Sequence, residues 1–212
     1  MIFNIITIFP LMFDRIFDFG VISQGIKSDK LKINIHNLRD FTHDKHKVVD
    51  DRPFGGGPGM VLKPEPLFEA VESIKSKNPG SRVIYLTPQG KKLTQEKIED
   101  LSKRENLTII CGRYEGIDQR VIDNLVDEEI SIGDYVLSGG EIPAMTIVDA
   151  VSRLIPKVIK NEEFNDSESF SDKTDRTKLD YKVYTRPENY KGKKVPEILL
   201  SGNHEEIRKW RK

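Results

Sequence analysis

Cysteine, long apolar runs and a secretion signal are all missing or nearly missing from this sequence. Cys111 is the one cysteine among 212 residues, which excludes an intramolecular disulfide framework and a cysteine-rich zinc site. No apolar stretch reaches the roughly 18 residues that a membrane-spanning helix needs. Residues 1–9 lack the basic flank and the small-residue cleavage site of a signal peptide. We therefore expect a cytoplasmic protein with no membrane partner.

Neither sign of charge is in excess, since 34 Lys and Arg balance 34 Asp and Glu. Taken alone, this balance argues against a nucleic-acid partner. The distribution is uneven, however: residues 1–160 carry 22 basic and 23 acidic side chains, residues 161–185 carry 4 and 7, and residues 186–212 carry 8 and 4. The pattern predicts a near-neutral domain at 1–160, an acidic linker at 161–182 and a small basic module at 183–212.

Strand-like and helix-like segments alternate through the first part of the chain. Short β-branched runs predict strands, and apolar residues at helical spacing predict helices. This alternation is typical of an α/β domain with a largely parallel sheet. We expect strands at 2–9, 31–36, 83–86, 107–111 and 129–132, and helices at 11–21, 64–77, after a Thr94 cap, 117–125 and 142–155.

Two segments lack such periodicity. Residues 39–59 form a long polar and glycine-rich stretch, which is uncommon in a compact domain unless it has a functional role. Residues 160–182 show no pattern, and we expect them to be flexible. The pattern at 203–211 indicates the start of a helix.

Three glycine-bearing turns each follow an expected strand. Their sequences are TPQG at 87–90, GRYEG at 112–116 and GDYVLSGG at 133–140. Ligands of open α/β sheets bind at the carboxyl ends of the strands, and glycine lets the backbone approach a ligand closely. Ordinary turn chemistry explains any one turn equally well. Together, the three turns predict a pocket built largely from main chain.

Several common sites have no support. No G-x-G-x-x-G follows the first strand, and no Lys-Ser/Thr follows the glycines of 55–59, which excludes an ordinary dinucleotide site and a P-loop. Cys111 lies in an apolar run and is predicted to be a core residue rather than a nucleophile. G-x-S-x-G is absent, which disfavours a hydrolase. No metal-ligand spacing connects the four histidines, His36, His43, His46 and His204.

Long strings in a fixed order resemble a known family. They are DDRPFGGGPGM (50–60), YLTPQG (85–90), CGRYEGID (111–118), SIGDYVLSGGE (131–141), VSRLIP (151–156), YTRP (184–187) and LLSGNH (199–204). By these strings the chain resembles, over 1–212, the bacterial tRNA (guanine-N1)-methyltransferases, which modify the guanine 3′ of the anticodon at position 37.

The resemblance implies a fold that the residue patterns alone do not suggest. It implies the SPOUT class, an α/β domain with a deep C-terminal trefoil knot, plus a small, mostly helical C-terminal module. Knots are rare, so this expectation depends on the resemblance alone. It also implies S-adenosylmethionine in the knot's loops and a homodimer whose active sites are shared between subunits. The cofactor-binding residues it implies are Tyr85, Leu86, Thr87, Pro88, Gly112, Tyr114, Glu115, Gly116, Ile132, Gly133, Asp134, Tyr135, Val136, Leu137, Gly139 and Gly140.

The chemistry requires further groups. Guanine N1 carries a proton at neutral pH, so a general base must remove it, and the negative charge that builds on O6 needs a donor. The resemblance implies Arg153 as that donor, against a helix-surface ion pair as the alternative interpretation. The family places its linker aspartate directly before Ser-Phe, where this chain has Glu168. Asp166 is an alternative base, and Asp180 matches a second acidic family position.

The linker acids also fit a simpler role in solubility. The linker after Phe170 is longer than in the family. The helix that begins near 204 continues further in relatives, so we expect a shortened C-terminal module, which leaves tRNA affinity open. Glu115 is a candidate acceptor for the guanine amino group or for the neighbouring base. The candidate phosphate-binding residues are Arg39, Lys45, Lys47, Arg52, Arg186, Lys193, Lys194, Arg208, Lys209 and Arg211.

The sequence thus predicts an enzyme that methylates N1 of the guanine 3′ of the anticodon in tRNA. A related knotted methyltransferase with another RNA target is the nearest alternative, and a non-catalytic RNA-binding protein is the alternative from another class. Magnesium commonly supports the family's activity, yet no dedicated metal-ligand cluster is visible in the sequence.

Overall fold

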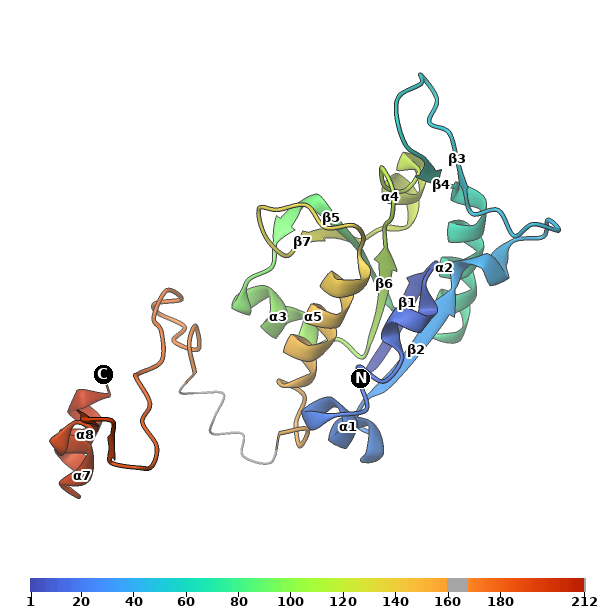
Figure 1. Cartoon of the computed structure of the whole chain (residues 1–212). Helices are drawn as coiled ribbons and strands as arrows, with labels where there is room; N and C mark the ends of the chain where they lie inside the picture. The colour runs from blue at the N-terminus through green and yellow to red at the C-terminus, as the bar shows by residue number, and fades with distance from the viewer. Residues whose placement is uncertain (160–167, 212) are drawn as a thin grey trace. The chain divides into compact units, whose positions relative to one another are not determined.

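The computed structural model describes residues 1–159 and 168–211. The chain divides into two compact units, Met1–Asn161 and Glu162–Lys212 (Figure 1). Whether the second unit is itself divided into a linker and a module, as expected, stays a prediction. Throughout the described ranges, every helix is too short or too polar to cross a membrane.

A parallel sheet forms the centre of the first unit. Its five strands follow the order β2-β1-β6-β5-β7, and every neighbouring pair is parallel. This confirms the predicted α/β class with a largely parallel sheet. The strands are β1 (Ile2–Thr7), β2 (Lys32–Asn37), β5 (Arg82–Lys92), β6 (Asn106–Cys111) and β7 (Glu128–Ser131).

Helices connect these strands, and local signals explain where two of them begin. Pro64 occupies the first turn of α2, where its missing N–H has no helical partner to lose. The Thr94 hydroxyl accepts a hydrogen bond from the backbone N–H of Lys97 and caps α3, as predicted. The helices are α1 (Gly20–Lys27), α2 (Pro64–Lys77), α3 (Gln95–Ser102), α4 (Gln119–Leu125) and α5 (Glu141–Ser152).

Two apolar clusters cover opposite faces of the sheet. Successive strand residues point to opposite faces, so Ile109 packs with α1, α3 and α5, whereas Ile110 packs with α2 and α4. Ile147 and Val148 of α5 belong to the first cluster and are fully buried. The first unit is therefore a three-layer sandwich, with helices on both faces of the sheet (Figure 1).

The helix predicted at 11–21 is wrong. The segment holds a short 3-10 turn, η1 (Pro10–Phe13), and α1 begins at Gly20 instead of ending there. The left-handed φ of 61° at Arg15 interrupts any continuous helix. Leu11 and Ile16, two of the apolar residues whose spacing predicts the helix, are 78% and 48% exposed. The apolar residues at 11–21 that resembled one face of a helix are in part exposed on the surface of the unit.

The chain crosses itself closely beyond β5. This strand continues past the predicted 83–86 to Lys92, and its pairing with β7 shifts register between Leu86 and Lys91. A Cβ on Gly90 would meet the backbone of β7, so only glycine fits. β6 and β7 flank β5 on opposite sides. The N–H of Gly140, which follows β7, nevertheless donates to the carbonyl of Gly112, which follows β6, at 2.9 Å.

The segment between β7 and α5 therefore passes across the end of β5. A Cβ on Gly140 would lie 2.7 Å from Cys111 Cα, so glycine is required at this crossing too. These close passages are where the knot is expected. The knot itself stays a prediction.

The elements of the second unit are short. The side chain of Asn203 accepts from the N–H groups of Glu205 and Glu206 and caps the last helix, which confirms a helix start near 203. The Tyr184 and Trp210 rings pack with centroids 6.2 Å apart. A hairpin that the sequence did not indicate precedes the helices. The elements are β8 (Asn189–Tyr190), β9 (Lys193–Lys194), α7 (Glu197–Leu200) and α8 (His204–Trp210).

Candidate functional site

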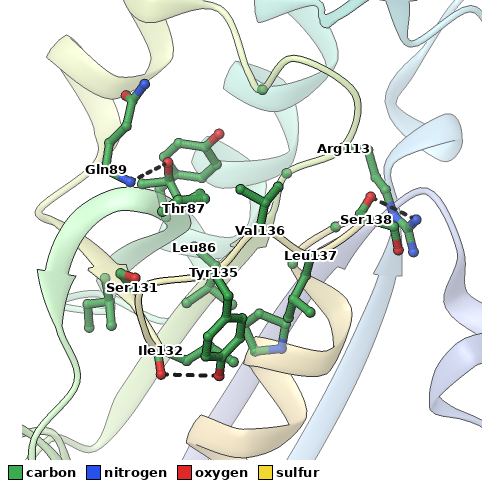
Figure 2. Close-up of a pocket in the computed structure, with 18 of the residues that line it drawn as sticks. Leu86, Thr87, Gln89, Arg113, Ser131, Ile132, Tyr135, Val136, Leu137 and Ser138 are labelled. Carbon is green, nitrogen blue, oxygen red and sulfur yellow. Dashed lines mark hydrogen bonds between the residues drawn. The ribbon is translucent and has the colours of Figure 1, made fainter.

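An open cavity of about 250 Å³ lies where β5, β6 and β7 end or bend (Figure 2). The three glycine-bearing turns line it, as their positions after the strands predict. Every residue that the resemblance assigned to the cofactor lines this cavity, except Asp134. The lining residues predicted from the sequence are Tyr85, Leu86, Thr87, Pro88, Gly112, Tyr114, Glu115, Gly116, Ile132, Gly133, Tyr135, Val136, Leu137, Gly139 and Gly140.

Asp134 has a different partner. Its carboxylate forms an ion pair with Lys92 on the exposed surface, and it does not line the cavity. Residues that the sequence argument missed all lie within or directly beside the three turns. Reading each turn as a continuous segment would have found three of the six, Gln89, Arg113 and Ser138. The six residues are Gln89, Arg113, Ile130, Ser131, Ser138 and Pro143.

The second turn, after β6, packs tightly against Tyr85. A Cβ on Gly112 would lie 2.9 Å from the Tyr85 ring, and one on Gly116 would lie 3.1 Å from its hydroxyl. Between these glycines, Tyr114 adopts a φ of 59°, a left-handed conformation that costs an ordinary residue about 1–2 kcal/mol. Such strain is often found at ligand sites, because the surrounding contacts must hold it in place.

Burial fixes the protonation of two groups at the cavity. It raises the pKa of the Tyr85 hydroxyl, which therefore stays a hydrogen-bond donor at neutral pH. Burial, reinforced by the negative charge of Glu141, raises the pKa of the Cys111 thiol well above its usual value. Cys111 is buried at the end of β6, which confirms the predicted core role.

The third turn, after β7, is held by hydrogen bonds within itself. The Tyr135 hydroxyl donates to the Ile132 carbonyl at 3.3 Å, and the Ser131 hydroxyl donates to the Gly133 carbonyl at 3.0 Å. Val136 and Leu137 project between the first turn and Arg113 (Figure 2). This turn therefore supplies an apolar side of the cavity.

The glycine-rich stretch is attached to the second turn. Its last part connects β3 (Asp50–Asp51) with β4 (Val61–Leu62), which pair as an antiparallel hairpin. The N–H of Glu115 donates to the Met60 carbonyl, and the N–H of Leu62 donates to the Gly116 carbonyl, both at 3.0 Å. A Cβ on Gly59 would lie 2.5 Å from Glu115 Oε1. The stretch thus ends beside the cavity.

Arg153 lies far from the cavity of its own chain. It caps the C-terminal end of α5, where its N–H donates to the Asp149 carbonyl at 3.3 Å, and it does not line the cavity. The cavity lies at the opposite end of α5, where Gly140 and Pro143 line it. A helix of 12 residues is about 18 Å long. The structure of one chain therefore does not bring Arg153 to the cavity.

Glu168 and Asp180 belong to one turn-rich segment of the second unit. The N–H of Asp180 donates to the Ser169 hydroxyl at 2.9 Å, and the N–H of Phe170 donates to the Lys178 carbonyl at 2.8 Å. These bonds bring together residues that are eleven and eight positions apart. The alternative base, Asp166, lies outside the described residues.

A second pair of linker carboxylates serves the turn itself. Asp172 accepts from both the N–H and the hydroxyl of Thr174, and these bonds lower the pKa of Asp172 to about 2. Asp175 accepts in the same way from Thr177, which lowers its pKa as well. Asp172 and Asp175 therefore stabilise local turns.

The basic candidates differ in how they are partnered. The Arg39 guanidinium donates to the Lys47 carbonyl at 3.0 Å, and Lys47 pairs with Asp40 at 3.4 Å. In the second unit, Lys209 pairs with Glu206, and Arg211 lies 4.7 Å from the centroid of the Tyr181 ring. Across residues 1–159 and 168–211, no three His, Cys, Asp or Glu side chains converge in a way that could hold a metal ion.

Comparison with known proteins places this geometry in a family. The model of the tRNA (guanine-1)-methyltransferase family, TrmD, matches residues 1–212. The chain belongs to this family. The resemblance found in the sequence motifs is thereby confirmed.

Relatives in the tRNA (guanine-1)-methyltransferase family are similar over most of their length. The tRNA (guanine-N(1)-)-methyltransferase of Vibrio vulnificus strain YJ016 is 53% identical over 209 residues, 98% of this chain and 82% of that protein. The enzyme of the same description from Shewanella sediminis is 54% identical, over 98% of this chain and 85% of that protein. The crystal structure of tRNA (m1G37) methyltransferase from Aquifex aeolicus superposes with a TM-score of 0.83 at 43% identity, over 99% of this chain and 87% of that one.

Proposed function

We propose that this protein transfers the methyl group of S-adenosylmethionine to N1 of the guanine 3′ of the tRNA anticodon, position 37, in the cytoplasm. The family and the described activities of its relatives support the reaction. The structural observation that carries the proposal is the cavity formed by three turns at the ends of neighbouring parallel strands. A non-catalytic RNA-binding role gives no reason for such a cavity.

The residues present fit S-adenosylmethionine. Leu86, Ile132 and Leu137 offer an apolar surface for adenine beside the main chain of the glycine turns. The Tyr85 hydroxyl and the Glu115 carboxylate are polar groups suited to the ribose and the charged end of the cofactor. When bound there, the cofactor supplies an electrophilic methyl group. The turns would hold the cofactor in place. Methyl transfer is an in-line displacement, and correct positioning of the reactants contributes much of its rate.

We assign the removal of the guanine N1 proton to Glu168. A glutamate has the same carboxyl group as the family's aspartate, with one additional methylene to place it. The bonds that connect Ser169 with Asp180 support a shared role for the two acids, in which Asp180 orders the segment that carries the base. Glu115, beside the glycine-rich stretch, is suited to accept from the guanine amino group.

We assign the stabilisation of negative charge on O6 to Arg153, acting in the cavity of a second copy of the chain. The length of α5 supports this assignment, because Arg153 and the cavity lie at opposite ends of that helix. The exposed apolar side chains of Leu11, Ile16 and Phe19 support a homodimer, since a subunit interface would remove them from water. Magnesium dependence and the knot remain expectations from the family.

The proposal is tested by methyl transfer to unmodified tRNA transcripts. The expected result is one methyl group on a transcript with guanine 3′ of the anticodon, and none on a matched transcript with adenine there. Calorimetry with S-adenosylmethionine separates the rivals: a non-catalytic RNA-binding protein binds none. A knotted methyltransferase with another RNA target binds the cofactor but leaves both transcripts unmodified. Adding EDTA to the assay tests the magnesium expectation.

A further inference from the structure

A fully buried carboxylate lies directly behind the third turn of the cavity. Glu141 is the first residue of α5, its side chain is entirely buried, and it does not line the cavity. A buried carboxylate is strongly unfavourable unless other groups neutralise it and donate to its oxygens. The Thr7 hydroxyl donates to Oε1 at 2.7 Å, and Arg113 Nε donates to Oε2 at 2.9 Å.

Arg113 extends this contact to the turn. Its Nη1 donates to the carbonyl of Ser138 at 3.0 Å (Figure 2). A Cβ on Gly139 would collide with the Arg113 side chain, so the turn has a glycine where the arginine passes. The guanidinium also lies 4.6 Å from the centroid of the Phe9 ring and donates to the Met12 sulfur at 3.1 Å.

These contacts connect segments that are far apart in the sequence. They join the end of β1, the turn after β6 and the N-terminus of α5 to one carbonyl of the third turn. The other side-chain bonds of that turn, from Ser131, Tyr135 and Lys92, involve only its first half. The second half therefore depends on Arg113 and on the bond from Gly140 to the Gly112 carbonyl.

Arg113 is a poor candidate for binding a substrate anion, although it lines the cavity. The charge of Glu141 neutralises it, and each of its three nitrogens already has an acceptor. Its side chain is only 14% exposed. A role in holding the protein chain fits this geometry better than a role in binding phosphate.

We propose that Glu141 is a positioning residue: through Arg113 it holds the Ser138 carbonyl, and with it the half of the third turn that must receive the ligand. The turn is then preorganised, so binding does not have to order it. The identity of the ligand, S-adenosylmethionine, rests on the proposed function. The positioning role itself concerns contacts within this chain.

The decisive variant is Glu141→Gln, which keeps the shape of the side chain but removes its charge. Glu128→Gln is the matched control. Glu128 is also a largely buried glutamate with two cationic partners, Arg82 at 3.2 Å and Lys97 at 2.6 Å, but it does not line the cavity and none of its partners does. Both variants thus lose an ion pair, but only Glu141→Gln loses one whose arginine contacts the third turn.

We expect Glu141→Gln to raise the Kd and the KM for S-adenosylmethionine about tenfold, the lower end of effects seen when a residue supporting a binding group is lost. The KM for tRNA and the kcat at saturating cofactor should change little, and Glu128→Gln should leave all four constants unchanged. Thr7→Val, which removes the bond to Oε1 and the bond that the Thr7 hydroxyl accepts from the Phe9 N–H, should shift the Kd in the same direction by less. Equal Kd values for wild type, Glu141→Gln and Thr7→Val would overturn the proposal, as would equal losses in Glu141→Gln and Glu128→Gln.

Hydrogen exchange without ligand provides a readout that a general loss of stability would not reproduce. The amide of Gly140 should exchange faster in Glu141→Gln and Thr7→Val than in wild type, and at the wild-type rate in Glu128→Gln. Uniformly faster exchange over all elements in Glu141→Gln would show a structural role only. A wild type that binds no S-adenosylmethionine would refute the proposed function, whereas the exchange experiment would still decide the positioning role.

Discussion

At the scale of single residues, burial decides which groups around the cavity are able to react. Tyr85 and Cys111 are both buried, and burial raises both pKa values. Glu168 lies instead in a turn-rich segment of the second unit. The carboxylates of Asp172 and Asp175 in that segment accept hydrogen bonds from backbone N–H groups and threonine hydroxyls. Two residue-level predictions follow from these differences.

Cys111 should resist alkylation in the native protein at pH 8. Its raised pKa keeps the thiol protonated, and burial keeps the reagent away. Mass spectrometry after iodoacetamide treatment should find it unmodified when native and fully modified in denaturant. Rapid labelling of the native protein would contradict the assigned burial.

Glu168→Gln should lower kcat by about 10²–10⁴-fold, the usual contribution of a general base, while cofactor binding is retained. Single-turnover methyl transfer and calorimetry measure the two quantities. Asp172→Asn is the matched control, since its carboxylate already accepts from Thr174, and it should keep its activity. Activity retained in Glu168→Gln would move the base to Asp180 or Asp166.

At the scale of elements, β7 is anchored at its first residue. Glu128 pairs with Arg82 of β5 and Lys97 of α3. Burial alone would raise the pKa of Glu128, but hydrogen bonds from Lys97 and Arg82 outweigh it and lower this pKa. The anchor fixes the N-terminal end of β7, opposite the end from which the third turn of the cavity departs.

Glu128→Gln should lower the free energy of unfolding by about 1.5–3 kcal/mol at neutral pH, the usual range for a hydrogen bond to a charged group. A lowered pKa in the folded state means that the carboxylate stabilises the fold above the unfolded-state pKa. That contribution is lost as the pH falls through the folded-state pKa. Urea unfolding at several pH values should therefore show wild type and variant converging in acid. A difference that grows as the pH falls would contradict the ion pair.

At the scale of the whole molecule, one chain does not hold all the proposed groups in one place. Arg153 and the cavity lie at opposite ends of α5, and apolar side chains such as Leu11 and Phe19 are exposed. The proposed site shared between two copies would account for both observations.

Mixed dimers test the shared site. Arg153→Ala removes the proposed O6 donor, and Val136→Trp fills the cavity at a residue that is 83% exposed and tolerates a larger side chain. Each variant alone should be inactive. Random two-fold assembly of equal amounts should restore about a quarter of wild-type activity, because half the dimers contain one intact site out of two. No recovery after co-refolding would place Arg153 in its own subunit's site, or outside the reaction.

Local patterns in the sequence predicted much of the fold. The Pro64–Lys77 helix and the Thr94 cap follow from nearest neighbours along the chain, so the sequence is enough to locate them. The expected helix at 11–21 failed because exposed apolar residues imitated a helical core face. The prediction that Asp134 lines the cavity is wrong because its carboxylate pairs with Lys92, at the end of β5, on the exposed surface.

The sequence by itself determined the family, the parallel α/β class and the three turns that line the cavity, because each depends on residues close together along the chain. Only the tertiary structure decided that Arg153 is remote from that cavity and that Glu141 stands behind it. Glu141 and Thr7 are 134 positions apart, and no local pattern indicates that they share a hydrogen bond. The sequence gives only a net charge of zero, whereas the fold shows which charges pair, such as Arg113 with Glu141 and Arg82 with Glu128.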